Sequence, residues 1–176
     1  MPNVEGKQIV IRGAVVKDVP AIARIVNGYA SQGLMLPRSL HNLYQCVRSF
    51  VVAATDDQVI GCGALQVFWH DLAEVRSLAV EEAWAGKGIG RLMVRHLIDA
   101  ARSLGVPRVF TLTYRQHFFE RLGFHEIPRK RLPHKIWTDC LNCPKYPDCD
   151  EIALMLDDLE DFQADGEEGQ APEAKT

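Results

Sequence analysis

A short glycine-rich loop is the first candidate for chemistry in this sequence of 176 residues. Residues 86–90 read Gly-Lys-Gly-Ile-Gly and lie between a strand-like segment and a helix-like segment. Glycines let a backbone approach an anion at positive φ, and a helix start presents unpaired N–H groups at the positive end of its dipole. The loop therefore predicts a phosphate-binding turn, to which Lys87 and Arg91 add positive charge. Its glycine spacing matches neither a Walker loop nor a leading Rossmann unit.

A carboxylate and a guanidinium, Glu74 and Arg76, interrupt an otherwise apolar strand just before this loop. Strand alternation predicts Leu72, Glu74, Arg76 and Leu78 on one face and Ala73, Val75, Ser77 and Ala79 on the other. Glu74 is therefore a candidate general base, acting directly or through water. A structural ion pair or a solvated face is the alternative interpretation.

The cysteines form a second candidate group. Cys140 and Cys143 have Cys-x-x-Cys spacing and are followed by Cys149, which resembles a metal-ligand pattern. A structural zinc site would need one more ligand, such as His134 or Asp150. Reduced structural thiols are the favoured interpretation, so no metal is predicted; zinc and a redox pair stay open as alternatives.

Length and composition indicate one globular domain, since 47% of the residues are hydrophobic and 24% are charged. No apolar run is long enough for a membrane-spanning helix, and the N-terminal residues do not resemble a signal peptide. The odd number of cysteines, five, is typical of reduced thiols. We therefore expect a cytoplasmic protein without a membrane partner.

The net charge of −3 is the sum of two unlike parts. Residues 157–176 contain eight acids and one lysine, so they carry −7 and leave +4 on residues 1–156. The acidic segment has few apolar residues and is predicted to be a disordered tail. A nucleic-acid partner is not expected, because the basic run Arg129–Arg131 is short and has no reading helix beside it.

Apolar periodicity predicts the elements that must position these residues. Strands are expected at 8–12, 50–54, 59–68, 72–80, 109–113, 124–127 and 152–156. Helices are expected after Asp18, after Ser39, after Gly90 and over 116–122. Residues 128–150 form an irregular cysteine-containing insert. This order indicates an α+β fold with a mixed sheet between helices.

Three segments, taken in order, resemble the GNAT family of N-acetyltransferases. They are Leu72–Val80, Ala85–Gly90 and Phe118–Phe124. The family's pyrophosphate motif, Arg/Gln-x-x-Gly-x-Gly/Ala, is matched at Gly88 and Gly90, with alanine at its first position. The resemblance covers about residues 8–156. It implies a three-layer α/β/α fold whose mostly antiparallel sheet is splayed between the fourth and fifth strands, here 72–80 and 108–113.

The resemblance also implies acetyl-CoA as co-substrate, inserted in that splay. The residues it assigns to the coenzyme are Leu78, Ala79, Val80, Gly86, Lys87, Gly88, Ile89, Gly90, Arg91, Phe118 and Phe119. Many family members have a tyrosine at the position of Phe119, where it protonates the leaving thiolate. A phenylalanine has no proton to give, so in this chain the thiolate leaves with help from water or another polar group, or leaves unaided.

Within the family, the sequence resembles the short bacterial N-acetylglutamate synthases of arginine biosynthesis at residues 33–40, 60–65, 69–74 and 109–113. That resemblance implies glutamate as the acceptor and places Arg38, Arg76 and Lys135 at its carboxylates. A homodimer is compatible with such a domain. Other acceptors, namely another amino acid, a polyamine or a protein amine, remain alternatives, as does a non-catalytic acyl-CoA sensor.

Overall fold

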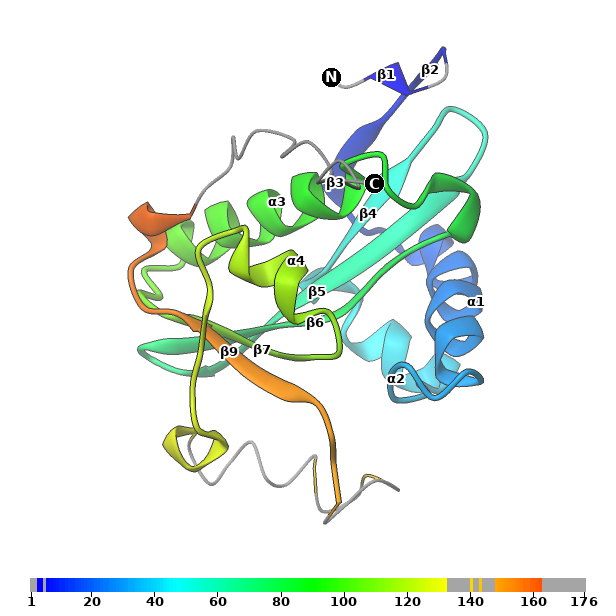
Figure 1. The fold of residues 1–176 in the computed structure, drawn as a ribbon. Coiled ribbons are helices and arrows are strands. Elements are labelled where there is room, and N and C mark those ends of the chain that lie inside the picture. The colour runs from blue at the N-terminus through cyan, green and yellow to red at the C-terminus, as the bar shows by residue number, and fades with distance from the viewer. Residues whose placement is uncertain (1–2, 5, 133–139, 141–142, 144–147, 163–176) are drawn as a thin grey trace, which may run out of the picture.

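The computed structural model describes residues 3–4, 6–132, 140, 143 and 148–162. A seven-stranded mixed sheet forms the middle layer (Figure 1). In spatial order its strands are β3 (Val10–Gly13), β4 (Phe50–Ala54), β5 (Val59–Trp69), β6 (Leu72–Val80), β7 (Val109–Thr113), β9 (Ile152–Leu156) and β8 (His125–Glu126). Neighbouring strands are antiparallel except for β6 and β7. The expected α+β class is confirmed.

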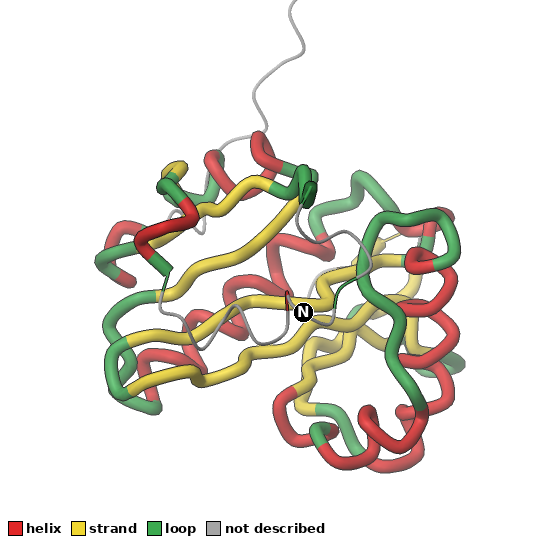
Figure 2. The backbone as a smooth tube through the Cα atoms, turned by 90° about the horizontal axis from the view of Figure 1, so that it is seen from below, coloured by secondary structure: helices red, strands yellow, loops and turns green. Residues whose placement is uncertain are grey.

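Helices cover both faces of this sheet (Figures 1 and 2). The helices α1 (Val19–Ala30) and α2 (Leu40–Gln45) pack on one face, where their buried side chains join those of β4 and β5. On the other face lie α3 (Ile89–Ser103) and α4 (Gln116–Glu120), with Met93, Leu97 and Phe119 in the larger core. Short 3-10 turns occupy Val16–Asp18, Val47–Ser49, Glu82–Trp84, Arg129–Arg131 and Leu159–Asp161.

The sheet opens between β6 and β7. Only two residue pairs join these strands, Ala73 with Val109 and Glu74 with Phe110. Beyond them β7 continues to pair with β9 through Thr113, whereas β6 continues beside β5 to Val80. The two strands therefore diverge toward their C-terminal ends, as the resemblance to the family implies.

A β-bulge in β6 changes which side chains share a face. Cys62 pairs with Ala79 and Ala64 with Arg76, so Ser77 and Leu78 together oppose Gly63. Ser77 has φ of 53°, a left-handed conformation typical of bulged residues. The expectation that Leu78 shares a face with Glu74 and Arg76 is therefore wrong. The extra residue reverses the alternation, and Leu78 packs against the core on the α3 side.

Gly63 makes room for this reversal. A Cβ atom at Gly63 would lie 2.9 Å from Cδ1 of Leu78 and 3.3 Å from Cδ1 of Leu97 on α3. Leucine side chains therefore fill the space that a side chain at position 63 would need. The bulge, Gly63 and α3 form one packed unit beneath the splay.

Two helix starts use their polar residues differently. The Ser39 hydroxyl accepts the Asn42 N–H at 3.1 Å and caps α2, as expected. Asp18 precedes α1, but its carboxylate makes no cap bond to that helix. It is buried and accepts from the Arg12 guanidinium at 2.6 Å and from the Val15 N–H at 2.9 Å. These contacts hold the pKa of Asp18 below its ordinary value and fix the entry to α1.

The ends of the fold differ from the sequence-based expectation. Strands β1 (Asn3–Val4) and β2 (Lys7–Gln8) form a separate antiparallel pair before the main sheet. At the other end Leu159 and Phe162 are buried in the larger core, so the folded part extends past the expected boundary at residue 156. Their apolar side chains were hidden within a segment whose average composition is acidic. No described helix is both long and apolar enough to cross a membrane.

Candidate active site

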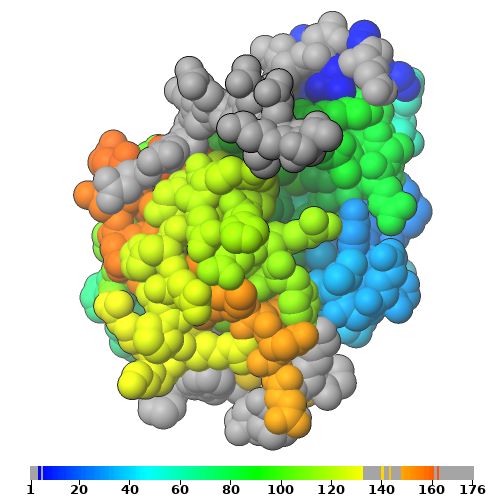
Figure 3. Space-filling view, viewed as in Figure 1, coloured from blue at the N-terminus to red at the C-terminus, as the bar shows by residue number. Residues whose placement is uncertain are grey.

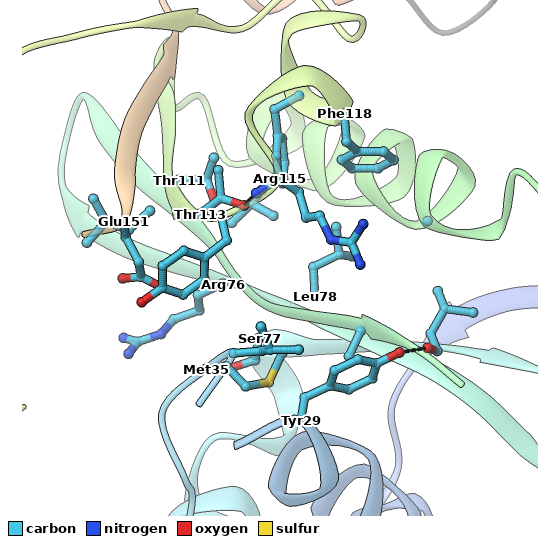
Figure 4. Close-up of a pocket in the computed structure, with 18 of the residues that line it drawn as sticks. Tyr29, Met35, Arg76, Ser77, Leu78, Thr111, Thr113, Arg115, Phe118 and Glu151 are labelled. Atoms are coloured by element: carbon cyan, nitrogen blue, oxygen red, sulfur yellow. Dashed lines mark hydrogen bonds between the residues drawn. The ribbon is translucent and has the colours of Figure 1, made fainter. Parts of the chain in front are cut away.

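A cavity of about 1010 Å³ occupies the splay between β6 and β7. Its walls come from both strands, from residues 84–86 and 88–91 around the start of α3, from α4, and from the loop after α1. Figure 4 shows side chains from these separate elements around it. On the molecular surface, the segment from α1 into the following loop (blue) lies beside the α4 segment (yellow-green) (Figure 3). The volume suits a ligand of cofactor size.

One end of the cavity is made by the glycine loop and the start of α3. Gly86 and Gly88 have φ of 76° and 77°, conformations that favour glycine. Gly88 precedes α3, and no side chain caps this helix start. The first-turn N–H groups of a 15-residue helix therefore face a wall that also carries Arg91. Such an arrangement fits the phosphates of a coenzyme.

Lys87 behaves differently from the other loop residues. Its ammonium donates to the Ala83 carbonyl at 2.9 Å and lies 5.2 Å from the centre of the Trp84 ring. All other residues that the sequence assigns to the coenzyme line the cavity, but Lys87 does not. The ammonium group of Lys87 therefore contacts Ala83 and Trp84 rather than the cavity.

The β6 wall combines backbone and side chains. Leu78, Ala79 and Val80 line the cavity, and the Tyr29 hydroxyl on α1 donates to the Val80 carbonyl at 2.6 Å (Figure 4). Burial raises the pKa of Tyr29 and Glu82 raises it further, so the phenol stays a hydrogen-bond donor. Tyr29 ties α1 to the end of β6.

The aromatic pair on α4 supplies surface rather than protons. Phe118 and Phe119 meet edge to face with ring centres 5.0 Å apart, and Phe119 is buried in the core. Phe118 lies beside Gly90 at the start of α3. Neither ring has a group that could protonate a leaving thiolate.

The other end of the cavity is polar. Glu74 is 7% exposed, and its Oε2 lies 3.5 Å from Nη1 of Arg76. Both residues line the cavity, together with Arg129 and Glu151. Figure 4 shows Arg76 and Glu151 on this side. Glu74, the candidate base, and the guanidinium of Arg76 therefore line the same cavity as the glycine loop and the start of α3. A buried carboxylate beside one cation can accept a proton and return it.

Arg38 reaches this space from the loop after α1. Its backbone N–H donates to Oδ1 of Asn27 at 2.9 Å, and its carbonyl accepts from Nδ2 of Asn27 at 3.0 Å. Its guanidinium donates to Oδ1 of Asn42 at 2.9 Å. The amide of Asn27 thus clamps the backbone of a residue that lines the cavity. Lys135, the third expected acceptor residue, lies outside the described residues.

Three cysteines gather at the same end. Cys140, Cys143 and Cys149 all line the cavity, and the Cys143 N–H donates to the Cys140 carbonyl at 2.9 Å. Burial raises the pKa of Cys140, and the neighbouring Cys149 and Cys143 thiols raise it further. Among the described residues no group of three or more His, Cys, Asp or Glu side chains is arranged to hold a metal. His134 lies outside that range.

Cys62 belongs to a different environment. It is fully buried below α1, and burial raises the pKa of its thiol to about 12. It is therefore a structural thiol, as expected, and takes no part in the cavity.

Sequence reasoning missed several lining residues. Tyr29 reads as an ordinary position of an amphipathic helix, and only the tertiary fold brings it to the cavity. Arg115, which follows β7, points into the cavity near Phe118 (Figure 4). Thr111 and Thr113 could have been predicted as lining residues, because their hydroxyls alternate with apolar residues in a buried strand.

Comparison with known proteins agrees with this geometry. Residues 26–124 match the acetyltransferase (GNAT) family. The chain belongs to the GNAT family. Its matched region runs from α1 through the splay, the glycine loop and α4, so it contains most of the cavity wall.

Other GNAT proteins resemble it over most of its length. An N-acetyltransferase of Chlorobaculum tepidum is 48% identical over 82% of this chain and 94% of its own. An amino-acid acetyltransferase of Mycobacterium tuberculosis is 46% identical over 67% of this chain and 69% of its own. N-acetylglutamate synthase of Neisseria gonorrhoeae, solved with coenzyme A and N-acetyl-glutamate, is 29% identical with a TM-score of 0.77; the match covers 84% of this chain and 34% of that one.

The fold, the family and these relatives together assign the reaction class. This GNAT protein is an acetyl-CoA-dependent N-acetyltransferase. The cavity between β6 and β7 is large enough for the coenzyme, and the uncapped start of α3 suits its phosphates.

Proposed function

We propose that this enzyme transfers the acetyl group of acetyl-CoA to the α-amine of L-glutamate. One observation carries the proposal: Arg76 lies beside the buried carboxylate of Glu74 at the end of the cavity away from the glycine loop, and Arg38 lines the same cavity. A dicarboxylate amine needs cations for its carboxylates and a base for its ammonium group. Guanidinium groups hold carboxylates through paired hydrogen bonds.

The coenzyme half of the reaction uses backbone groups. In this proposal the pyrophosphate lies at the first-turn N–H groups of α3 and beside Arg91. The pantetheine lies along β6 at Leu78 and Val80, beyond the last pairing of β6 with β7. The thioester then reaches the apex of the splay, next to Glu74.

The acceptor half of the reaction begins with the loss of a proton from the ammonium group of the acceptor. An ammonium group is not nucleophilic, so Glu74 accepts a proton from it, directly or through water. The neutral nitrogen attacks the thioester carbonyl, the C–N bond forms, and the C–S bond breaks with its electron pair on sulfur. Nη1 of Arg76, 3.5 Å from Oε2 of Glu74, orients that carboxylate toward the acceptor.

The relatives support glutamate as the acceptor. The Mycobacterium tuberculosis relative is named an amino-acid acetyltransferase, and the Neisseria gonorrhoeae neighbour was solved with N-acetyl-glutamate. We infer that the same acceptor serves this chain, in the cytoplasm and in arginine biosynthesis. The carboxylate of Glu151 at the same end of the cavity is the feature that would suit a cationic acceptor instead.

Thiol release from acetyl-CoA tests the acceptor directly. The purified protein is assayed with L-glutamate, L-glutamine, L-aspartate, spermidine and a lysine-containing peptide at matched concentrations. We expect the highest kcat/KM with L-glutamate and an acetylated α-amine by mass spectrometry. A preference for spermidine or the peptide would contradict the proposal, and binding of CoA without any turnover would indicate a sensor.

A further inference from the structure

The proposed mechanism does not use the cysteine pair Cys140 and Cys143. Both residues line the cavity, are partly exposed and are reduced thiols in the structure. The Cys143 N–H donates to the Cys140 carbonyl at 2.9 Å. Such a bond, from a residue to the one three positions earlier, brings their Cα atoms within about 7 Å. Disulfides join Cα atoms about 4.4–6.8 Å apart, so the backbone of this pair is close to the separation that a disulfide needs.

The electrostatic surroundings of Cys140 place the pair at the acceptor end of the cavity. Burial raises the pKa of the Cys140 thiol most, Cys149 and Cys143 raise it further, Arg129 lowers it, and Glu74 raises it. Cys140 is therefore close enough to Cys143 and to the candidate base to interact with both. A thiol whose ionised form is disfavoured also favours a disulfide once it has formed, because reduction then yields no stabilised thiolate.

The remaining cysteines have other surroundings. Cys62 is fully buried, so a small molecule in the cavity does not reach it. Cys46 follows α2 outside the cavity wall, and its thiol donates to the Asn42 carbonyl at 3.0 Å. The Cys149 thiol lies 3.9 Å from Oε2 of Glu151. The part of the chain that the structure describes also holds no group of three or more potential ligands arranged for a metal, which favours thiol chemistry at the pair.

We propose that Cys140 and Cys143 form a reversible disulfide by exchange with a small-molecule disulfide, and that this modification weakens binding of the acceptor. The thiolate of one cysteine attacks a sulfur of the small disulfide, whose S–S bond breaks and releases one thiolate. The second cysteine loses its proton, attacks the cysteine sulfur of the mixed disulfide and expels the other thiolate. Two cysteine thiols are thereby oxidised, the small disulfide is reduced to two thiols, and these take up the two protons.

The effect on the acceptor follows from the place of the pair and rests on the proposed position of the acceptor beside Glu74. The reduced pair offers two S–H donors to the cavity, whereas a disulfide offers none and fixes the torsion between its sulfur atoms. Oxidation therefore changes the acceptor end and leaves the backbone donors at the start of α3 unchanged. We expect the KM for the acceptor to rise about fivefold or more, with the KM for acetyl-CoA within about twofold.

Peptide mass spectrometry identifies the bond without any need for turnover. The full chain is purified without chelator, incubated with excess oxidised glutathione, and digested with trypsin under non-reducing conditions. Cleavage after Lys135 and Lys145 leaves Cys140 and Cys143 in one peptide, residues 136–145, and Cys149 in the next. We expect the first peptide to lose the mass of two hydrogen atoms and to regain it with dithiothreitol.

Kinetics before and after oxidation measure the consequence. After gel filtration, initial rates are recorded with acetyl-CoA and with the acceptor that gives the highest turnover in the thiol-release assay. The parent protein should show the rise in KM for the acceptor after oxidised glutathione and lose it after dithiothreitol. Cys143→Ser should not respond to either reagent, whereas Cys46→Ser, the matched control outside the cavity, should respond like the parent. Circular dichroism checks that both variants fold.

The outcomes separate this inference from the proposed function. A bond that links the two peptides through Cys149, a lasting glutathione adduct, or stoichiometric zinc that blocks the thiols would overturn the assigned disulfide. A confirmed disulfide with an unchanged KM for the acceptor would overturn its effect on binding. If the reduced parent acetylates no amine in the panel, the proposed function fails, and the peptide masses still decide whether the disulfide forms.

Discussion

The two ends of the cavity are built in different ways. The end at the start of α3 uses backbone: the glycine loop, the uncapped first turn and the edge of β6 beyond its last pairing with β7. The opposite end uses side chains, namely Glu74 and Arg76 on β6 with Cys140, Cys143 and Cys149, and Arg38 adds a guanidinium to the cavity wall from a loop. Strand β6 therefore serves both ends, with its backbone edge at one and the side chains of Glu74 and Arg76 at the other.

Because of this difference, a side-chain substitution should have different effects at the two ends of the cavity. A backbone donor survives most side-chain replacements, so the coenzyme end is sensitive chiefly to changes of conformation. A guanidinium or carboxylate is lost with its side chain, so the acceptor end is sensitive to chemistry. Variants at the two ends should therefore move different kinetic constants.

Glu74→Gln gives the largest expected effect. Removing the base should lower kcat/KM for glutamate about 100-fold or more, because neutral glutamine cannot accept the proton of the ammonium group. The affinity for CoA should stay within about twofold, since that end relies on backbone groups. Thiol release across pH 6–10 and calorimetry with CoA measure the two quantities. Glu126→Gln, on the far side of the sheet edge at β8, is the control; an unchanged pH profile of kcat/KM in Glu74→Gln would reject the base.

Gly88→Ala tests the coenzyme end through conformation. With φ of 77° at Gly88, a Cβ atom costs about 1–2 kcal/mol, and the loop must distort to relieve it. The KM for acetyl-CoA should rise about tenfold, while that for glutamate changes little. Gly105→Ala is a matched control, because Gly105 follows the other end of α3 with φ of 72°. Equal effects of both variants on the KM for acetyl-CoA would contradict a role for the loop beyond stability.

Arg38→Ala tests the acceptor end. Losing one guanidinium–carboxylate contact should raise the KM for glutamate by about tenfold and leave the KM for acetyl-CoA unchanged. Arg38→Lys keeps the charge but not the paired hydrogen bonds, so we expect an intermediate KM. Initial rates with each substrate varied provide the comparison. A KM for glutamate that does not move in either variant would remove Arg38 from the acceptor site.

Asp18→Asn should leave both ends functional and lower only stability. Asp18 is buried, and its carboxylate binds Arg12 and the Val15 N–H, so we expect a loss of about 2 kcal/mol in the free energy of unfolding at pH 7. The pKa of Asp18 is lowered in the folded state, so its contribution is complete above the ordinary value of 3.8 and is lost as the pH falls further.

Urea unfolding of Asp18→Asn and the parent at pH 7 and at pH 3 measures this contribution. The difference between the two proteins should shrink at the lower pH, whereas a difference independent of pH would mean that the carboxylate charge is not responsible. Glutamate and acetyl-CoA kinetics at pH 7 should match those of the parent at temperatures where both are folded.

The sequence predicted one end of the cavity better than the other for a physical reason. The loop at Gly86–Gly90 and the following amphipathic helix are local patterns, and their places along the chain match the structure. The bulge at Ser77 has no local signature, so the expected face of Leu78 was wrong. Only the packing of α1 brings Tyr29 to the cavity and Asn27 to the backbone of Arg38, and periodicity cannot reveal either contact.

The helix α1 also has a thermodynamic consequence. Through Tyr29 it binds the Val80 carbonyl on the coenzyme wall, and through Asn27 it clamps the backbone of Arg38 at the acceptor end. A single rigid element therefore contacts both substrates' walls. Any factor by which acetyl-CoA changes the affinity for the acceptor must be returned in equal measure by the acceptor. Any coupling that α1 transmits between the two proposed binding sites would therefore act equally in both directions.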